Sequence, residues 1–479
     1  MKLKIKNTIY GLSLLVLLTS CDNFLDVHPQ GEVVGKDLLT ERKGFENALY
    51  GVYASMRGDK AYGAYMTYYV MDVLAQYFNC YGNNNITDLS AFKYKENPEV
   101  TQIFYDIWSA MYQNISYVNN ILINLEDQSP KTLEFYDIYK GEALGLRAYM
   151  HFDLLRLYAD QATTAKTRGI VYNTAFSLKP SDILPKTEVY KRIIAELREA
   201  EKLLDNKELY QAASPEDGFF QDQPIHFNLQ AVRATLARVY LTQENIDSAY
   251  YYADKVIKEG GFELVEKTEI ANDIIGTLSS KETIFGLYAK ESFYTRTKDD
   301  LYNSITYRSL DPRSSIATVY QQGGGGNDYR WAAWFQTLTS NLRFVKLTDP
   351  YQLNAGDRPQ GQIPGINLIR LPEMYYIAAE CLLRKNNPAA ADYFNAVLES
   401  RGLVTLDDRI PAEPLTLEKI TQERYKEFVG EGQTFFNMKR LNLDIQAITG
   451  EILPADNSIY VVPIPEEEFS YRNEVYEVE

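Results

Sequence analysis

Aromatic and amide side chains gather in two stretches of this 479-residue chain, 65–85 and 294–334. An aromatic ring can stack on the C–H face of a sugar, and an asparagine amide donates and accepts hydrogen bonds in fixed directions that suit paired hydroxyl groups. Such groups would bind a carbohydrate without altering it. The candidate ligand-binding residues are Tyr65, Tyr77, Tyr81, Asn83, Asn84, Asn85, Tyr294, Tyr302, Tyr307, Tyr329, Trp331 and Trp334.

Both stretches also have a structural interpretation. The segment 81–88, YGNNNITD, has loop chemistry because Gly and Asn tolerate left-handed backbone, and the tyrosines beside it could simply pack inward. Trp334 could anchor its segment onto the rest of the protein. Against this, two of the three tryptophans lie next to four consecutive glycines, and exposed aromatic clusters mark binding sites. Our hypothesis is that at least one of Tyr329, Trp331 and Trp334 contacts a ligand.

The N-terminus combines basic residues, an apolar run and a cysteine. Three lysines precede an apolar run at 9–18, which would form roughly 15 Å of helix and is too short to span a bilayer. The run ends in LTSC at 18–21, which resembles the bacterial lipobox. We expect 1–20 to be removed as a signal peptide and the thiol of Cys21 to be lipidated, which would anchor the protein to a membrane without spanning it.

The sequence lacks the residues that most enzymatic reactions require. Histidine occurs only at 28, 151 and 226, and His151 is expected to be packed within a helix. No nucleophile elbow, zinc-protease motif or dinucleotide fingerprint is present, and the glycines at 323–326 are not followed by the Gly-Lys-Ser/Thr of a phosphate-binding loop. The cysteines at 21, 80 and 381 have no metal-binding spacing. We therefore expect no catalytic residues, no metal and no cofactor.

The charge of the chain excludes one class of partner. The formal net charge is −16 and the sequence pI is about 4.9. A chain this acidic repels phosphate backbones, so nucleic acid is not expected as a ligand. The hydrophobic content of 45% is ample for a large core.

Helical periodicity recurs along most of the chain. Pairs of short helices are expected near 100–160, 187–258, 372–402 and 416–441. Their predicted N-caps include Thr187, Asn228 and Thr416. Small residues such as Gly141 and Gly145 indicate that one helix approaches its neighbours closely. Paired helices of this kind must stack on further pairs to bury their apolar faces. Between them, 262–367 has no sustained helical period, and 282–289 is predicted to be a short strand.

A resemblance to a known family is carried by IRLPEMYYIAAECLLR (369–384), YFNAVLESRGL (393–403), ITQERYKEFVGEGQTFFNMKRL (420–441) and VVPIPEEEF (461–469). These segments resemble the SusD/RagB family of Bacteroidetes outer-membrane lipoproteins, and 423–440 is the most specific part. The chain departs from the usual pattern at Pro372, Gln433, Thr434 and Asn437, which we interpret as variation in the scaffold.

The resemblance implies a mostly α, tetratricopeptide-like scaffold of helical pairs. The signal peptide 1–20 would precede a single domain, 21–479, with its scaffold at about 40–260 and 368–445 and a loop-rich insert containing short strands at about 262–367. The resemblance further implies a structural role for Asp328 and Arg330.

The function implied by the resemblance is binding and delivery. A surface-exposed lipoprotein of the outer membrane would capture an oligosaccharide and pass it to a TonB-dependent, SusC-like transporter. The alternative is a subunit that binds peptide or protein nutrients, or that forms a structural lid on such a transporter and has no sugar site.

Overall fold

The computed structural model describes residues 39–79, 82–162, 164, 166–177, 179–206, 217–273, 276–303, 309–321, 328–338, 340–349 and 362–470. The predicted signal peptide, the lipidation residue Cys21, and two ligand candidates, Tyr81 and Tyr307, lie outside these segments.

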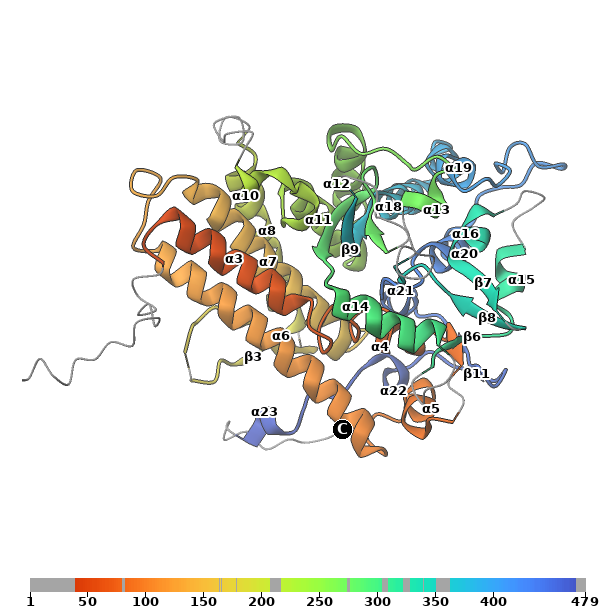
Figure 1. The fold of residues 1–479 in the computed structure, drawn as a ribbon, viewed down its shortest axis with the longest axis horizontal. Coiled ribbons are helices and arrows are strands. Elements are labelled where there is room, and N and C mark those ends of the chain that lie inside the picture. The colour runs from red at the N-terminus through yellow and green to blue at the C-terminus, as the bar shows by residue number, and fades with distance from the viewer. Residues whose placement is uncertain are drawn as a thin grey trace, which may run out of the picture.

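Helices dominate the described structure, as the sequence predicts (Figure 1). The long ones are α3 (Arg42–Met56), α6 (Pro98–Leu125), α7 (Tyr136–Tyr158), α8 (Lys186–Leu204), α11 (Leu229–Thr242), α12 (Ile246–Glu259), α18 (Leu371–Arg384) and α19 (Ala390–Ser400). From α6 to α19 each of these helices packs against the next, and α3 covers α6. This continuous stack confirms the mostly α fold. No helix in the described segments is long and apolar enough to cross a membrane.

Helix α7 packs against α3, α6, α8 and α11 and is buried on nearly every side. A Cβ atom at Gly141 would lie 2.6 Å from Cγ of Leu204 in α8, and one at Gly145 would lie 2.5 Å from Cδ1 of Phe227. Both distances are shorter than a carbon–carbon contact allows. The two glycines therefore permit the close approach that the sequence indicates.

The predicted helix starts are confirmed at two of three positions. The side chain of Asn228 accepts from the N–H groups of Gln230 and Ala231, and that of Thr416 accepts from Lys419. The prediction for Thr187 is wrong, because α8 begins at Lys186 without a side-chain cap. There the N–H of Lys186 donates to the carbonyl of Thr167 at 2.8 Å, so the backbone of a neighbouring segment replaces the cap.

The prediction of a loop at 81–88 is also wrong over most of its length, because helix α5 (Asn84–Ser90) begins inside it. The Asn83 side chain accepts from the N–H groups of Asn85 and Ile86, at 3.0 and 3.3 Å, and so caps the helix. Ile86 and Leu89 are buried on its inner side. Asparagine favours both turns and N-caps, and the apolar pair decides between them.

The two longest strands are β5 (Thr283–Tyr288), within the segment 262–367, and β9 (Ile363–Arg370), which extends from it to Arg370. Strand β9 pairs antiparallel with β4 (Thr277–Leu278) and β5, and β5 confirms the strand predicted at 282–289. The antiparallel pairs are β1 (Phe78–Asn79) with β6 (Asp311–Pro312), β7 (Phe335–Leu338) with β8 (Asn341–Phe344), β2 (Arg168–Val171) with β3 (Ile183–Pro185), and β10 (Ile445–Gln446) with β11 (Ile452–Leu453).

The remaining helices complete the described chain. They are α4 (Val70–Leu74), α10 (Gly218–Gln221), η2 (Gln223–Ile225), α13 (Ile270–Asp273), α14 (Glu291–Thr297), η3 (Lys298–Tyr302), α15 (Ile316–Gln321), α16 (Tyr329–Trp334), α20 (Leu417–Glu427), α21 (Thr434–Leu441), α22 (Asn457–Tyr460) and α23 (Glu467–Ser470). Among them α20 has 11 residues, as α19 does.

Candidate functional site

The two aromatic stretches, far apart in the sequence, meet in the fold. Strand β1 pairs with β6, so that Phe78 lies opposite Pro312. The hydroxyl of Tyr68 donates to Oδ2 of Asp300 at 2.8 Å. The guanidinium of Arg296 lies 5.7 Å from the ring centroid of Tyr69. These contacts join the first stretch to α14, η3 and β6 of the second.

Three of the predicted ligand residues cannot present a ring face in this structure. Tyr77 is 1% exposed, Tyr294 is 3% exposed and Trp334 is fully buried. The hydroxyl of Tyr77 contacts Oγ1 of Thr434 at 2.7 Å, and that of Tyr294 donates to the carbonyl of Gly276. The ring of Trp334 lies 4.0 Å from the ammonium group of Lys346. For these three residues the structural interpretation is the correct one.

The other described candidates are accessible to different extents. Tyr329 is exposed, whereas Tyr65, Tyr302 and Trp331 are half-buried. Among the asparagines, Asn84 is exposed.

The other two asparagines already make contacts within the protein. Asn83 caps α5, and Oδ1 of Asn85 accepts from the amide of Asn97 at 3.1 Å. Asn84 is therefore the asparagine of this segment that is best placed to contact a ligand.

A row of packed rings fixes Trp331. Its indole stacks on Phe335 with ring centroids 4.9 Å apart and an interplanar angle of 22°. Phe335 contacts Phe344 at 5.4 Å, and Phe344 contacts Phe78 of β1 at 5.7 Å. One side of the Trp331 ring is thus held by the core, and the residue keeps part of its surface exposed.

The β7–β8 hairpin lies between the accessible rings. Helix α16, with Tyr329 and Trp331, runs directly into β7, and β8 packs against η3, which ends at Tyr302. The outer side chains of the hairpin are polar and exposed at Gln336, Thr337 and Asn341. Sequence reasoning missed them, although the alternation of polar and apolar residues in NLRF at 341–344 is a usable strand signal. We refer to Tyr302, Tyr329, Trp331, Gln336, Thr337 and Asn341 as the aromatic face.

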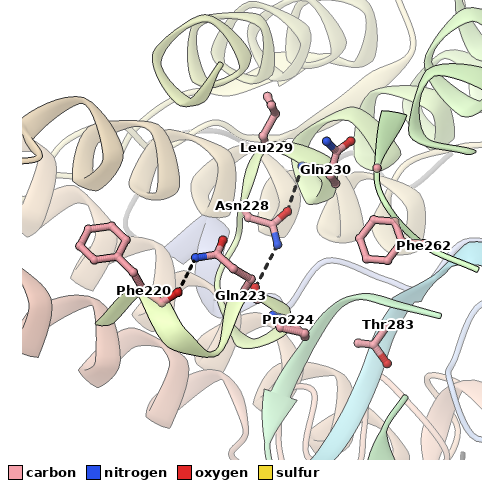
Figure 2. A pocket seen from close by; sticks show the side chains of 9 residues that line it. Phe220, Gln223, Pro224, Asn228, Leu229, Gln230, Phe262 and Thr283 are labelled. Atoms are coloured by element: carbon pink, nitrogen blue, oxygen red, sulfur yellow. Dashed lines mark hydrogen bonds between the residues drawn. The ribbon is translucent and has the colours of Figure 1, made fainter. Parts of the chain in front are cut away.

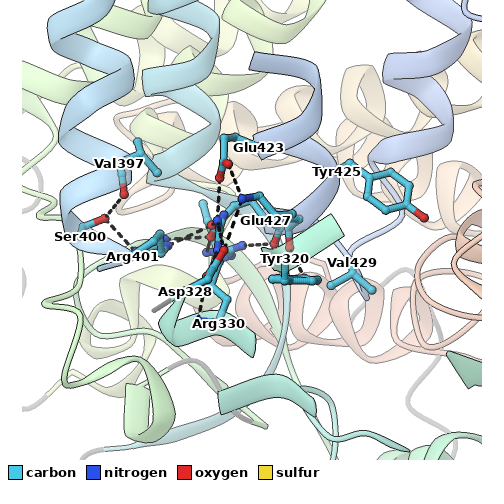
Figure 3. Close-up of polar contacts among 12 residues, drawn as sticks. Tyr320, Asp328, Arg330, Val397, Ser400, Arg401, Glu423, Tyr425, Glu427 and Val429 are labelled. Atoms are coloured by element: carbon cyan, nitrogen blue, oxygen red, sulfur yellow. Dashed lines mark hydrogen bonds and ion pairs between the residues drawn. The ribbon is translucent and has the colours of Figure 1, made fainter. Parts of the chain in front are cut away.

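A buried ionic network holds α16 in place (Figure 3). The carboxylate of Asp328 caps α16 and accepts from Nε and Nη2 of Arg330 at 2.9 and 2.8 Å. Arg330 donates onward to Glu423 at 2.6 Å and to Glu427 at 3.0 Å, both on α20. The structural role expected for Asp328 and Arg330 is therefore present, and it fixes the helix that carries Trp331.

The network contains equal numbers of cations and carboxylates, all at most 7% exposed: Arg330, Lys346, Arg370, Arg401 and Lys426 with Glu282, Asp328, Glu423, Glu427 and Glu431. Burial by itself raises the pKa of Glu427, but the guanidinium groups of Arg401 and Arg370 hold that pKa well below its usual range. The carboxylates here are therefore ion-paired within a core of balanced charge.

A separate cavity of about 470 Å³ lies between η2, α11 and β5 (Figure 2). Phe220 and Phe262 flank it, and Oε1 of the lining residue Gln230 is buried without a hydrogen bond, whereas the amides of Gln223 and Asn228 are engaged within the protein. Gln223 donates to the carbonyl of Phe220 at 3.0 Å, and Asn228 donates to that of Gln223 at 2.9 Å. The predicted ligand residues that the structure describes are not among its lining residues.

His151 is packed as predicted, and Cys381 is buried as well. His151 is fully buried, donates from Nδ1 to the carbonyl of Arg147 at 2.9 Å and accepts at Nε2 from the N–H of Asn173 at 3.0 Å. Burial lowers the pKa of His151 to about 3 and raises that of the Cys381 thiol to about 12, so both are uncharged near neutral pH. Within the described segments, side chains are not grouped in a way that could hold a metal ion.

The fold is that of a helical-repeat scaffold with an irregular insert, and matches to known proteins identify it. The chain belongs to the SusD family: 23–241 match a family described as starch-binding associating with the outer membrane, and 237–475 match the SusD family itself. The resemblance seen in the sequence is thereby confirmed.

Individual relatives are distant but similar over most of their length. The SusD-like protein P25 of Formosa agariphila is 22% identical over 83% of this chain and 82% of its own. A SusD superfamily protein of Bacteroides thetaiotaomicron superposes with a TM-score of 0.73 at 23% identity, covering 89% of this chain and 97% of that one. A SusD-like carbohydrate-binding protein of Bacteroides vulgatus has a TM-score of 0.69 at 19% identity, covering 90% and 96%. These likenesses establish the SusD-like fold.

Proposed function

We propose that this protein is a glycan-binding lipoprotein that captures an oligosaccharide on the aromatic face and delivers it to a TonB-dependent transporter in the outer membrane. The lipid on Cys21 would hold the protein at the membrane. The starch-binding description of the matched family and the carbohydrate-binding relative support this proposal. We expect binding without catalysis, since the buried carboxylates of the ionic network are ion-paired.

The observation that carries the proposal is the fixed orientation of Trp331. Its ring is stacked against Phe335, and its helix is fixed by the Asp328–Arg330 pair. A ring that is already ordered loses little conformational entropy when a sugar stacks on it, so more of the contact energy remains as affinity. The exposed amides of Gln336 and Asn341 nearby could then accept and donate to the hydroxyl groups of the sugar.

The test is a glycan array followed by calorimetry on the soluble form that starts after Cys21. We expect Trp331→Ala to weaken binding of the best glycan by roughly tenfold, which corresponds to about 1.4 kcal/mol. Tyr251→Ala is the matched control, because Tyr251 is a 54% exposed ring on α12, outside the aromatic face. The Tyr251→Ala variant should bind the glycan with the same affinity as the parent.

Two results would oppose the proposal. Equal affinities of the parent and the Trp331→Ala variant would remove the aromatic face from the site. An array without any bound glycan, together with binding to a peptide library, would favour the alternative of a peptide-binding or lid subunit.

A further inference from the structure

A second cavity, of about 570 Å³, lies between α15, α20 and α21, beside the β1–β6 pair. The N–H of Arg313, in its wall, donates to the carbonyl of Tyr77 in the segment leading to β1 at 2.8 Å. The cavity is lined by the aromatic rings of Tyr425 and Phe428, and by polar side chains that include Gln422 and Asn437. Its lining therefore combines ring surface with hydrogen-bonding groups.

Arg424 is the unusual residue of this cavity. It lines the cavity and is only 6% exposed. Its Nε and Nη1 atoms are buried and make no hydrogen bond. The closest ion-pair contact of its Nη2 is with Oε1 of Glu373 at 3.7 Å, beyond hydrogen-bond distance.

Glu373 is already occupied by another arginine. Arg238 donates to its Oε1 from Nε at 2.9 Å and to its Oε2 from Nη2 at 2.6 Å. Glu373 thus has a bidentate ion pair with Arg238, and Arg424 lies beside that pair without a hydrogen bond to it. Leaving a buried guanidinium without hydrogen-bond partners is costly, so a fold that keeps one there needs a reason.

The surrounding charges are also unbalanced, in contrast to the network around Glu427. Three carboxylates serve five guanidinium groups in this cluster, which consists of Asp153, Glu373 and Glu380 with Arg156, Arg238, Arg384, Arg424 and Arg440. Burial lowers the pKa of Arg424 below its usual value. The cluster therefore favours an additional negative charge.

The two carboxylates that line the cavity do not place a negative charge inside it. Glu418 and Asp444 are both exposed. Glu418 accepts from the amide of Gln422 at 3.2 Å, and Asp444 accepts from the N–H of Ala455 at 2.9 Å. The buried end of the lining is thus cationic, while the acidic groups remain in solvent.

We propose that this cavity binds an acidic sugar, a ring of uronic-acid type whose carboxylate pairs with Arg424. A carboxylate matches the planar fork of a guanidinium and would supply the missing charge. The ring of Tyr425, half-buried and stacked on Tyr77 at 4.1 Å, is fixed in the wall and could contact the sugar. The inference rests on the proposed function in that the ligand is a carbohydrate, but its site is distinct from the aromatic face.

The test compares glucuronic acid, glucose and acetate by calorimetry on the soluble form that starts after Cys21. We expect glucuronic acid to bind at least tenfold more tightly than either glucose or acetate. Arg424→Met should lower the affinity for glucuronic acid to that for glucose, because the variant keeps an unbranched apolar stem and loses the charged guanidinium. Trp331→Ala should leave the affinity for glucuronic acid unchanged, so failure of this site and failure of the aromatic face are distinguishable.

Stability separates this role from a structural one. Arg424→Met should unfold at the same or a higher temperature than the parent when no ligand is present, because a buried guanidinium whose Nε and Nη1 make no hydrogen bond is replaced by an apolar side chain. The matched variant Arg238→Met, which breaks a bidentate pair in the same cluster, should unfold at a lower temperature. The proposal is overturned if Arg424→Met is destabilised like Arg238→Met, if it binds glucuronic acid like the parent, or if the parent binds acetate or glucose as tightly as glucuronic acid.

Discussion

Arg401 and Glu427 form a bidentate pair in which neither residue has any exposed surface. Nε of Arg401 donates to Oε2 of Glu427 at 2.9 Å, and Nη2 donates to Oε1 at 2.8 Å. Arg330 and Arg370 donate to the same carboxylate at 3.0 and 2.7 Å. One glutamate of α20 therefore connects α16, the end of β9 and the residue that follows α19.

This arrangement predicts that Glu427 is essential to the scaffold. Glu427→Gln should lower the free energy of unfolding by about 3–5 kcal/mol, because three buried guanidinium groups would lose their shared counter-charge. Equilibrium unfolding in urea near neutral pH measures the change. Glu418→Gln, at an exposed position on the same helix, should stay within about 0.5 kcal/mol of the parent. Equal stability of the two variants would contradict the central role of Glu427.

The same carboxylate predicts a pH dependence. The pKa of Glu427 in the folded protein is held well below the value of about 4.3 for an unfolded chain. The stabilisation is therefore fully present above that value, and is lost as the pH falls toward the pKa of the folded state, because the unfolded chain then binds a proton that the native protein does not.

Urea unfolding at a series of pH values below the unfolded pKa checks this dependence. The free energy of unfolding of the parent should fall by up to about 1.4 kcal/mol per pH unit more than that of Glu427→Gln. Parallel curves for the two proteins would show that Glu427 does not titrate differently in the folded and unfolded states.

Helix packing around α7 predicts opposite effects of the same substitution at two glycines. Gly145→Ala should destabilise the protein by about 1–3 kcal/mol, because its Cβ would meet the ring of Phe227. Gly51→Ala should stabilise it by about 0.5–1 kcal/mol, because Gly51 lies in α3, is exposed and has open space around its Cα. Thermal unfolding of both variants measures the difference. Similar shifts of the same sign would mean that steric contact does not govern the packing of α7.

Local patterns were sufficient to predict much of the scaffold. Contacts within a few residues, or on one helix face, can be predicted directly from the sequence. They include the helical periodicity, the caps at Asn228 and Thr416 and the small residues of α7. The error at Thr187 arose because a distant backbone carbonyl took over the capping role there.

The aromatic candidates could be predicted as a group but not one by one. Trp331 and Trp334 are separated by one helical turn, yet the first is half-buried and the second fully buried, since only Trp334 lies against Lys346. Tyr77 and Tyr294 likewise lost their predicted role to contacts with Thr434 and Gly276. No pattern in the sequence distinguished these rings, because each is covered by residues from elsewhere in the chain.

The sequence alone determined the family, the helical character of the chain and the two stretches in which aromatic residues gather. The tertiary structure decided which rings remain accessible, and it showed that Nε and Nη1 of Arg424 are buried without a hydrogen bond. The reason is physical: periodicity is a local property, whereas burial and charge pairing depend on partners brought together from distant positions by the fold.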